Sequence, residues 1–281
     1  MKTKTSFGVA LCRYNKNKNN SVEIMVIKKR YSYAFLSFVM AHYKKNDTKY
    51  IKYLFNNMSF SEKIDILSMQ FSQMWYRIWL NLPEKYFNIT DVYKSTKFAN
   101  SPIENRYTSA EIYKLFFEKK NKFESNFLND KGKKLQTLIQ NSDDAEILWE
   151  IPKGKKDDHN ETNMDCAVRE FYEETSITHD KYKILYNIEP LVDSYVDNDT
   201  IYKTIYYTAT LKDENENFTP QIDYRNFDQI SEIEQIKWVS LSEIKFFNLP
   251  KSMHFRLIKL YKSIIHTFKQ SKKIKKLTIF R

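Results

Sequence analysis

The sequence predicts an α/β fold with a mixed sheet, interrupted by an all-helical insertion. Three observations lead to this prediction. Two runs rich in β-forming residues, 6–13 and 22–29, lie near the N-terminus. Helical patterns then dominate from about Tyr33 to Asn141. Strand-like runs return at Ile147 and alternate with helical ones to the end of the chain.

We therefore expect three parts. Residues 1–34 would supply the N-terminal hairpin of the α/β core, and residues 142–281 the rest of that core with a C-terminal helix. Residues 35–141 would form the inserted helical domain. Hydrophobic residues make up 42% of the chain, and 3 glycines with 6 prolines are few, which favours a packed protein over a disordered one.

The N-terminal elements have clear boundaries. The polar segment Asn15–Asn20 separates the first two runs, which predicts a hairpin. In the insertion, Ser59 with Glu62 and Thr108 with Glu111 have the spacing of helix capping boxes. The stretch Phe60–Leu80 has apolar residues at helical intervals, namely Ile64, Leu67, Phe71, Met74, Trp75 and Ile78.

The C-terminal half alternates between the two kinds of element. We expect a helix around Asp165–Glu174 and an amphipathic helix over about Lys251–Lys269. A third capping-box spacing joins Ser240 to Glu243. The expected strands are Ile147–Glu150, Lys183–Ile188, Ile201–Leu211 and Gln235–Ser240.

Composition limits the class of protein. The net charge of +11 favours polyanionic partners such as nucleic acid, free nucleotides or anionic lipid, although Lys-rich solvated surfaces explain it equally well. Cys12 and Cys166 cannot form a disulfide framework or a cysteine-based zinc site. No apolar run approaches the ~20 residues that span a bilayer, and the N-terminus lacks a signal peptide. We expect an intracellular protein.

Three carboxylates carry the chemical signal. Glu170, Glu173 and Glu174 share one face of the expected helix, where only Arg169 is adjacent to relieve their repulsion. A hard divalent cation such as Mg²⁺, which binds carboxylate oxygens and accepts phosphates as further ligands, would resolve that repulsion. An acidic, solvated helix face is the alternative.

The surrounding residues favour the metal. Gly154 is followed by Glu161, and Arg169-Glu170 comes eight positions later, with Phe171 as an apolar anchor. This arrangement resembles the Nudix box of the Nudix hydrolase family, and implies that family's α/β/α sandwich and its metal-dependent cleavage of nucleoside diphosphate linkages. The chain departs from the box twice. Six residues instead of five separate Gly154 from Glu161, and Ser176 replaces the closing glycine, where positive φ would cost about 1 kcal/mol.

Further segments resemble the viral mRNA-decapping branch of this family, whose members come from African swine fever virus and the poxviruses. Three segments lie in the α/β core, and two precede or lie in the helical insertion. They are Trp149–Lys155, Cys166–Thr175, Glu232–Trp238, Ile27–Phe35 and Met74–Trp79. The resemblance implies capped mRNA as substrate, with 7-methyl-GDP and 5′-monophosphate RNA as products, in the host cytoplasm and also in the virion if the protein is viral.

The resemblance also implies roles for individual acids. Mg²⁺ or Mn²⁺ would be held by Glu161, Glu170, Glu173, Glu174 and Asp197. Glu170 and Glu174 would be catalytic, together with Glu232 as general base or extra metal ligand. Glu234 is an alternative to Glu232, and a turn aspartate is an equal alternative for Asp197. His159 and His179 match no zinc pattern.

Basic residues give candidate phosphate and RNA contacts. Around the box these are Lys153, Lys155, Lys156 and Lys203. In the insertion they are Lys119, Lys120 and Lys122, which lie among aromatic residues. The tail, residues 262–281, has six lysines, one arginine and no acid. Each of these groups could equally be a solvated face.

Three other functions fit the sequence less well. A Nudix hydrolase acting on free nucleotides or diphosphoinositol polyphosphates would not need a large basic insertion. A catalytically weak RNA-binding protein on a Nudix scaffold would not need all three glutamates. A basic helical interaction module leaves the acidic cluster unexplained. The sequence does not indicate the oligomeric state.

Overall fold

The computed structural model describes residues 2–15, 21–79, 109–197, 200–213, 219–249, 253–254, 256–262 and 264–266. The chain divides into two compact units. The first consists of Met1–Lys28, Leu148–Gln229 and Ile233–Arg281, and the second of Lys29–Ile147 with Ile230–Glu232. Among the described residues, no helix is long and apolar enough to cross a membrane.

The first unit is built on a mixed sheet. Its described strands are β1 (Lys2–Asn15), β2 (Ser21–Lys29), β3 (Trp149–Glu150), β4 (Lys153–Gly154), β5 (Tyr182–Ile184), β6 (Leu191–Asp197), β7 (Thr200–Leu211) and β8 (Ile233–Ser240). They are ordered β3-β2-β1-β7-β5, with β4 also on β1, β6 on β7 and β8 on β2. The β1–β2 hairpin is antiparallel, as predicted, whereas β1 and β7 run parallel from Lys2↔Thr200 to Cys12↔Thr210.

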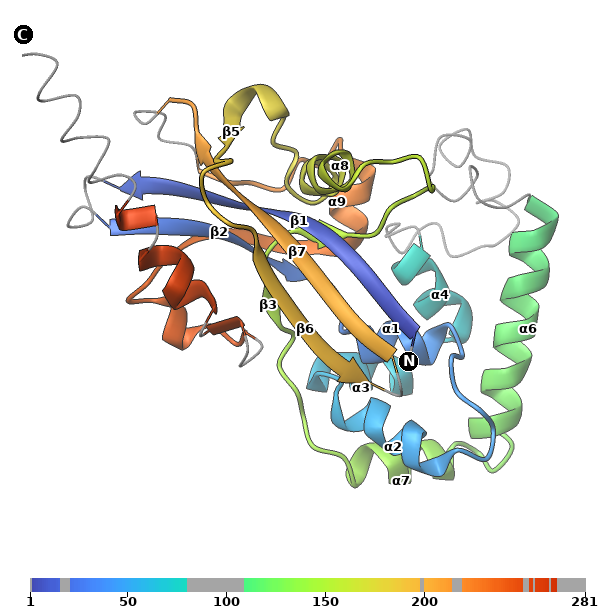
Figure 1. Ribbon diagram of the computed structural model, residues 1–281. Coiled ribbons are helices and arrows are strands. Elements are labelled where there is room, and N and C mark those ends of the chain that lie inside the picture. Colours follow the sequence, from blue (N-terminus) through green and yellow to red (C-terminus); the bar gives the residue numbers. More distant parts are fainter. Residues whose placement is uncertain are drawn as a thin grey trace, which may run out of the picture. The chain divides into compact units, whose positions relative to one another are not determined.

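Successive strand residues point to opposite sides of this sheet, so both faces carry apolar side chains. Helices cover both faces (Figure 1). On one face, Phe7, Val9 and Leu11 pack with Phe171 of α8 (Asn163–Thr175). On the other face, alternate β1 residues pack with Leu257, Leu260 and Tyr261 of the C-terminal helical segment. The predicted α/β/α sandwich with a mixed sheet is confirmed.

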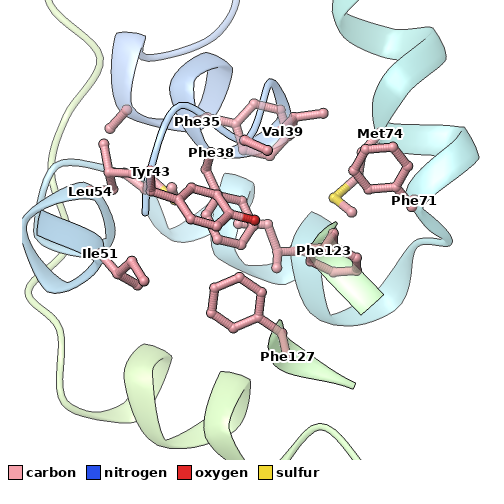
Figure 2. Close-up of a cluster of buried hydrophobic side chains, with 14 of the residues drawn as sticks. Phe35, Phe38, Val39, Tyr43, Ile51, Leu54, Phe71, Met74, Phe123 and Phe127 are labelled. Carbon is pink, nitrogen blue, oxygen red and sulfur yellow. The ribbon is translucent and has the colours of Figure 1, made fainter. Parts of the chain in front are cut away.

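The second unit is helical, as predicted. Its described helices are α1 (Tyr33–Val39), α2 (Thr48–Asn56), α3 (Phe60–Ser68), α4 (Phe71–Trp79), α6 (Ser109–Phe127) and α7 (Lys133–Gln140). Figure 2 shows their buried core, in which aromatic rings from several helices meet. Phe38, for example, lies 5.0 Å from Phe55 and 5.3 Å from Phe127 between ring centroids. The many aromatic residues of the sequence therefore serve packing here.

The expected helical stretch Phe60–Leu80 is two helices. The chain leaves helical geometry at Met69, which has extended φ and ψ of −99° and 149°. At the start of α4, the Gln73 side chain accepts a hydrogen bond from the Gln70 N–H at 2.8 Å. The break leaves Ile64 and Leu67 of α3 42% and 44% exposed, so these two do not share the core with Phe71 and its neighbours. The Ser59–Glu62 capping box is confirmed, and Thr108 lies outside the described residues.

The C-terminal elements differ from expectation in five respects. The strand expected over Lys183–Ile188 is only the three residues of β5, and strand β6 was not predicted. A short helix, α9 (Phe227–Glu232), precedes β8, which begins at Ile233 instead of Gln235. The Ser240 hydroxyl and N–H both donate to Glu243, but a 3-10 turn over Ile244–Phe246 follows instead of an α-helix.

Candidate active site

Helix α8 presents the candidate carboxylates. Thr162 caps its N-terminus by accepting a hydrogen bond from the Asp165 N–H at 3.1 Å. Ala167 and Phe171 are fully buried against the sheet, so the orientation of the helix is fixed by packing. Because residues three and four apart share a helical face, Glu170 and Glu173 project from the same side. Their side chains are 16% and 33% exposed, so both are partly accessible to solvent.

Gly154 makes room for one of these carboxylates. Strand β4 pairs with β1 through Phe7↔Gly154, which holds this residue beside α8. A Cβ atom built on Gly154 would lie 1.9 Å from Cδ of Glu170 and 2.0 Å from its Oε2. The Glu170 carboxylate therefore occupies the space that any other side chain would need at position 154.

Arg169 binds the acidic residues together. Its guanidinium contacts Glu161 at 2.7 Å, Glu170 at 3.1 Å and Glu173 at 3.2 Å. Nη2 also donates to the Lys155 carbonyl at 2.8 Å, which ties α8 to the segment after β4. The hydrogen bond from Arg169 lowers the pKa of the Glu161 carboxyl. Burial raises the pKa of Glu173, an effect that the charge of Arg169 opposes.

Glu174 contacts the backbone of strand β4 beside the Gly154 position that faces Glu170. It is only 4% exposed and accepts a hydrogen bond from the Lys153 N–H at 2.8 Å. The Lys153 side chain in turn pairs with Glu150 at 2.8 Å. The structure thus joins Glu161, Glu170 and Glu173 through one arginine and turns Glu174 toward strand β4.

The donor set fits a hard divalent ion. Within the described ranges, no three His, Cys, Asp or Glu side chains are arranged as a ready metal site, since Arg169 lies among the carboxylates. The available donors are nevertheless carboxylate oxygens concentrated on one helix, and the Gly154 cradle holds one of them close to the backbone. Mg²⁺ and Mn²⁺ prefer such ligands.

The remaining candidate acids lie on other elements. Glu232 ends α9 in the second unit, is 62% exposed and pairs with Lys29 at 2.8 Å. Glu234 lies in β8 of the first unit and pairs with Lys28 at 3.0 Å. Asp197 is the last residue of β6, opposite Thr200, and its side chain is outside what the structure describes.

The candidate lysines around the box are near one another. Burial lowers the pKa of Lys155, and the positive charges of Lys4 and Lys153 lower it further, whereas Glu170 opposes the shift. The Lys156 ammonium lies 5.6 Å from the centre of the Phe7 ring. Lys203 is the β7 partner of Thr5 in β1.

The candidate lysines of the helical unit have local partners. Lys119 pairs with Glu118 at 2.9 Å, and Lys120 lies 3.9 Å from Glu124. Lys122 donates to the Ala41 carbonyl at 2.8 Å and lies 4.9 Å from the centre of the Tyr43 ring. Lys122 therefore has a packing role, whereas the contacts of the other two are with acids on the surface of α6.

Sequence reasoning missed an aromatic surface. Tyr195 of β6 and Tyr202 of β7 stack with ring centroids 5.0 Å apart and an interplanar angle of 8°. The Lys4 ammonium lies 5.4 Å from the centre of the Tyr202 ring, and Tyr195 is 59% exposed. Strand β6 was not predicted, so its register with β7, which brings the two tyrosines together, could not be read from the sequence.

Sequence reasoning also missed two amide side chains. Asn226 and Gln229 contact the last turn of α8 through Ser176 and two backbone carbonyls. The spacing of Asn226 from Gln229 matches a helix cap, but nothing in the sequence links it to α8.

Comparison with known proteins finds the following similarities. A model of the NUDIX domain matches residues 126–263. The mRNA-decapping protein g5R of African swine fever virus (a warthog isolate from Namibia) is 36% identical over 264 residues, covering 92% of this chain and 94% of that protein. A protein of Acanthamoeba polyphaga mimivirus whose description also names mRNA decapping is 29% identical over 237 residues, covering 80% of this chain and 60% of that protein. A crystal structure of a C. elegans Ap4A hydrolase is 12% identical with a TM-score of 0.43, covering 93% of this chain and 98% of that one.

Proposed function

Because this chain belongs to the Nudix family and is related along most of its length to the viral mRNA-decapping proteins, we propose that it hydrolyses the mRNA cap. The reaction cleaves the triphosphate bridge and releases 7-methyl-GDP and 5′-monophosphate RNA. Its place of action is the host cytoplasm, where capped mRNA is translated.

The observation that carries this proposal is the packing of Gly154 against Glu170 beside Arg169. The close approach explains why a glycine is needed at that point of the box. The arginine explains why an acidic cluster can fold without unrelieved repulsion. A solvated acidic helix face would require neither feature.

Divalent metal dependence is part of the proposal. Glu170, Glu173 and Glu174, with Glu161 and Asp197 as further candidates, would hold Mg²⁺ or Mn²⁺. When bound, the ion supplies positive charge to the phosphates and makes water a stronger nucleophile. Arg169 holds Glu161, Glu170 and Glu173 on one side of α8 and limits the number of orientations open to them. Glu232 is our proposed general base, which takes the proton of the attacking water, and Glu234 is the alternative.

The substrate contacts we propose combine lysines and aromatic rings. Lys4, Lys153 and Lys155 would bind the phosphates by donating hydrogen bonds to their oxygens. The stacked Tyr195 and Tyr202 would accept a nucleobase, since base–aromatic stacking contributes about 1–3 kcal/mol per base. An inositol polyphosphate has no aromatic face, so this surface favours a nucleotide substrate over that alternative.

The RNA body would extend beyond this surface. We propose that the helical segment 35–141 binds it through Lys119 and Lys120, helped by the basic tail, most of which is outside the described residues. Lys122 contributes less to this contact because its ammonium is engaged within the unit.

One assay tests the function directly. Wild-type protein is incubated with RNA labelled in its cap, with Mg²⁺ or Mn²⁺ and with chelator, and the released nucleotide is identified. We expect 7-methyl-GDP only when metal is present, and much faster release from RNA-tethered cap than from free cap dinucleotide. Equal rates on both substrates would identify a small-nucleotide hydrolase. Tight RNA binding without product would identify a binding protein on a Nudix scaffold.

A further inference from the structure

The last turn of α8 ends in a serine with left-handed backbone geometry. Ser176 has φ of 58° and ψ of 16°, and its N–H closes the helix by donating to the Tyr172 carbonyl at 2.7 Å. This is the position where the Nudix box has glycine. A serine is strained in this geometry where a glycine is not, but its hydroxyl makes contacts that a glycine cannot make.

The Ser176 hydroxyl joins two amide side chains from the segment before β8. It lies 3.1 Å from Oε1 of Gln229, and it accepts a hydrogen bond from Nδ2 of Asn226 at 2.9 Å. One hydroxyl thus donates once and accepts once. Gln229 is fully buried, and its Oε1 also accepts from the Asp223 N–H at 2.6 Å.

The same amides reach the backbone of α8. Nε2 of Gln229 donates to the Glu174 carbonyl at 3.1 Å, and Nδ2 of Asn226 donates to the Glu173 carbonyl at 3.4 Å. Both carbonyls belong to the last turn, where no later helical N–H is available to them. Glu174 and Thr175 are 4% and 2% exposed, so water has little access to this turn. The two amides therefore cap the helix from a distant part of the chain.

These carbonyls belong to the two glutamates whose carboxylates we propose as metal ligands. A turn that frayed would let both side chains swing, and a carboxylate pair must be held in place to bind an ion. Residues that orient metal ligands typically contribute 10–100-fold to metal affinity or activity.

We infer that Gln229 and Asn226, joined through Ser176, are positioning residues for Glu173 and Glu174. They act through the backbone of α8 and touch neither substrate nor metal. This inference rests on the proposed function, because it assumes that these glutamates bind a divalent ion.

Mn²⁺ titration of the full chain without substrate tests the inference. Gln229→Met keeps the shape of the side chain and removes both hydrogen-bonding groups. Gln221→Met is the matched control, because Gln221 lies in the same segment and is exposed. We expect Mn²⁺ affinity about 10–100-fold weaker in Gln229→Met, measured by electron paramagnetic resonance at a temperature where circular dichroism shows a folded protein, and unchanged affinity in the control.

A second variant covers the case in which Gln229→Met does not fold. Asn226→Ser retains a residue that caps α9, but removes the amide that reaches Ser176 and Glu173. It should also weaken Mn²⁺ binding, with a smaller effect because the contact it removes, at 3.4 Å, is longer than the 3.1 Å contact that Gln229→Met removes. A folded Gln229→Met or Asn226→Ser protein with wild-type Mn²⁺ affinity and only a lower melting temperature would overturn the inference.

Cleavage of capped RNA tests the proposed function, and Mn²⁺ affinity tests the inference. If the wild type binds Mn²⁺ but does not cleave capped RNA, the proposed function fails, and the variant titrations still decide the inference. If the wild type binds no Mn²⁺, the inference fails with the metal mechanism.

Discussion

The box helix and the helical unit depend on their residues in different ways. In the first unit, Arg169 contacts Glu161, Glu170 and Glu173 within 3.2 Å, and a single glycine leaves room for one of these carboxylates. In the second unit, the core is a set of aromatic rings, and the lysines on α6 have separate partners. In the proposed function, catalysis would depend on few residues at fixed spacing, whereas RNA binding would depend on summed charge. We therefore expect single substitutions to be severe in the box and graded among the lysines of α6.

The largest effect should come from removing one carboxylate of the box. Glu170→Gln keeps the shape of the side chain, but removes a proposed metal ligand and a partner of Arg169. We expect decapping to fall more than the roughly 10²–10³-fold seen when one charge-stabilising donor is lost. The exposed Glu189→Gln is the matched control, and single-turnover decapping is the measurement. A Glu170→Gln rate within tenfold of wild type would remove this residue from the mechanism.

The next test compares a glycine from each unit. Gly154→Ala places a methyl group 1.9 Å from Cδ of Glu170, so the carboxylate must move. Decapping activity should fall nearly as far as in Glu170→Gln. Gly132→Ala has nothing within 4 Å, but its φ of 76° is strained for alanine. It should cost about 1 kcal/mol of stability and leave decapping unchanged. Urea unfolding and decapping rates measure both, and equal activity losses would contradict the comparison.

Glu232 and Glu234 should differ in their effect on the pH–rate profile. Glu232→Gln removes the proposed general base, which would contribute roughly 10²–10⁴-fold, and should flatten the acidic limb of the pH–rate profile. Glu234→Gln, on the adjacent strand, should stay near the wild-type rate. RNA binding should be unchanged in both. The opposite result would transfer the role to Glu234, and two wild-type profiles would move the search to Asp197.

The lysines of α6 should show the graded response. Lys119→Met should lower the slope of RNA affinity against salt concentration by about 1, as expected for one lost phosphate contact. Lys122→Met should change that slope less, and should instead lower stability by about 1 kcal/mol because the hydrogen bond to the Ala41 carbonyl is lost. Filter binding at several salt concentrations and urea unfolding separate the two effects. A larger slope change in Lys122→Met would reverse the assignment.

The smallest effect concerns acid stability. The hydrogen bond from Arg169 lowers the folded-state pKa of Glu161 below its ordinary value of 4.5. The ionised carboxyl therefore stabilises the fold above about pH 4.5, and this contribution is lost as the pH falls through the lower, folded-state pKa. Wild type should be more stable than Glu161→Gln at pH 7, and the difference should shrink below pH 4. A difference that grows on acidification would contradict this assignment.

Local features of the molecule were predicted from the sequence, whereas contacts between distant parts of the chain were not. The α/β fold with its helical insertion, the hairpin and helix α8 followed from periodicity, and the resemblance to the Nudix family implied the sandwich. The packing of Gly154 against Glu170 was not predicted. The left-handed backbone expected at Ser176 is confirmed. The break at Met69 and strand β6 were missed, because their local patterns do not differ from those of a continuous helix or a loop. The contacts of Ser176 with Asn226 and Gln229 join residues about 50 positions apart, a distance over which a single sequence carries no pairing signal.

The parallel pairing of β1 with β7 has a consequence for synthesis of the protein. Its register joins Cys12 to Thr210, partners about 200 residues apart. At roughly 5–20 residues per second, a ribosome needs on the order of 10–40 s between them. The emerging β1 strand can pair with β2 as soon as β2 is made. Its other edge stays exposed while the helical unit is synthesised, because β7 follows that unit in the chain. Stalled nascent chains should therefore acquire decapping activity only when Thr210, and the proposed base Glu232 after it, have left the exit tunnel.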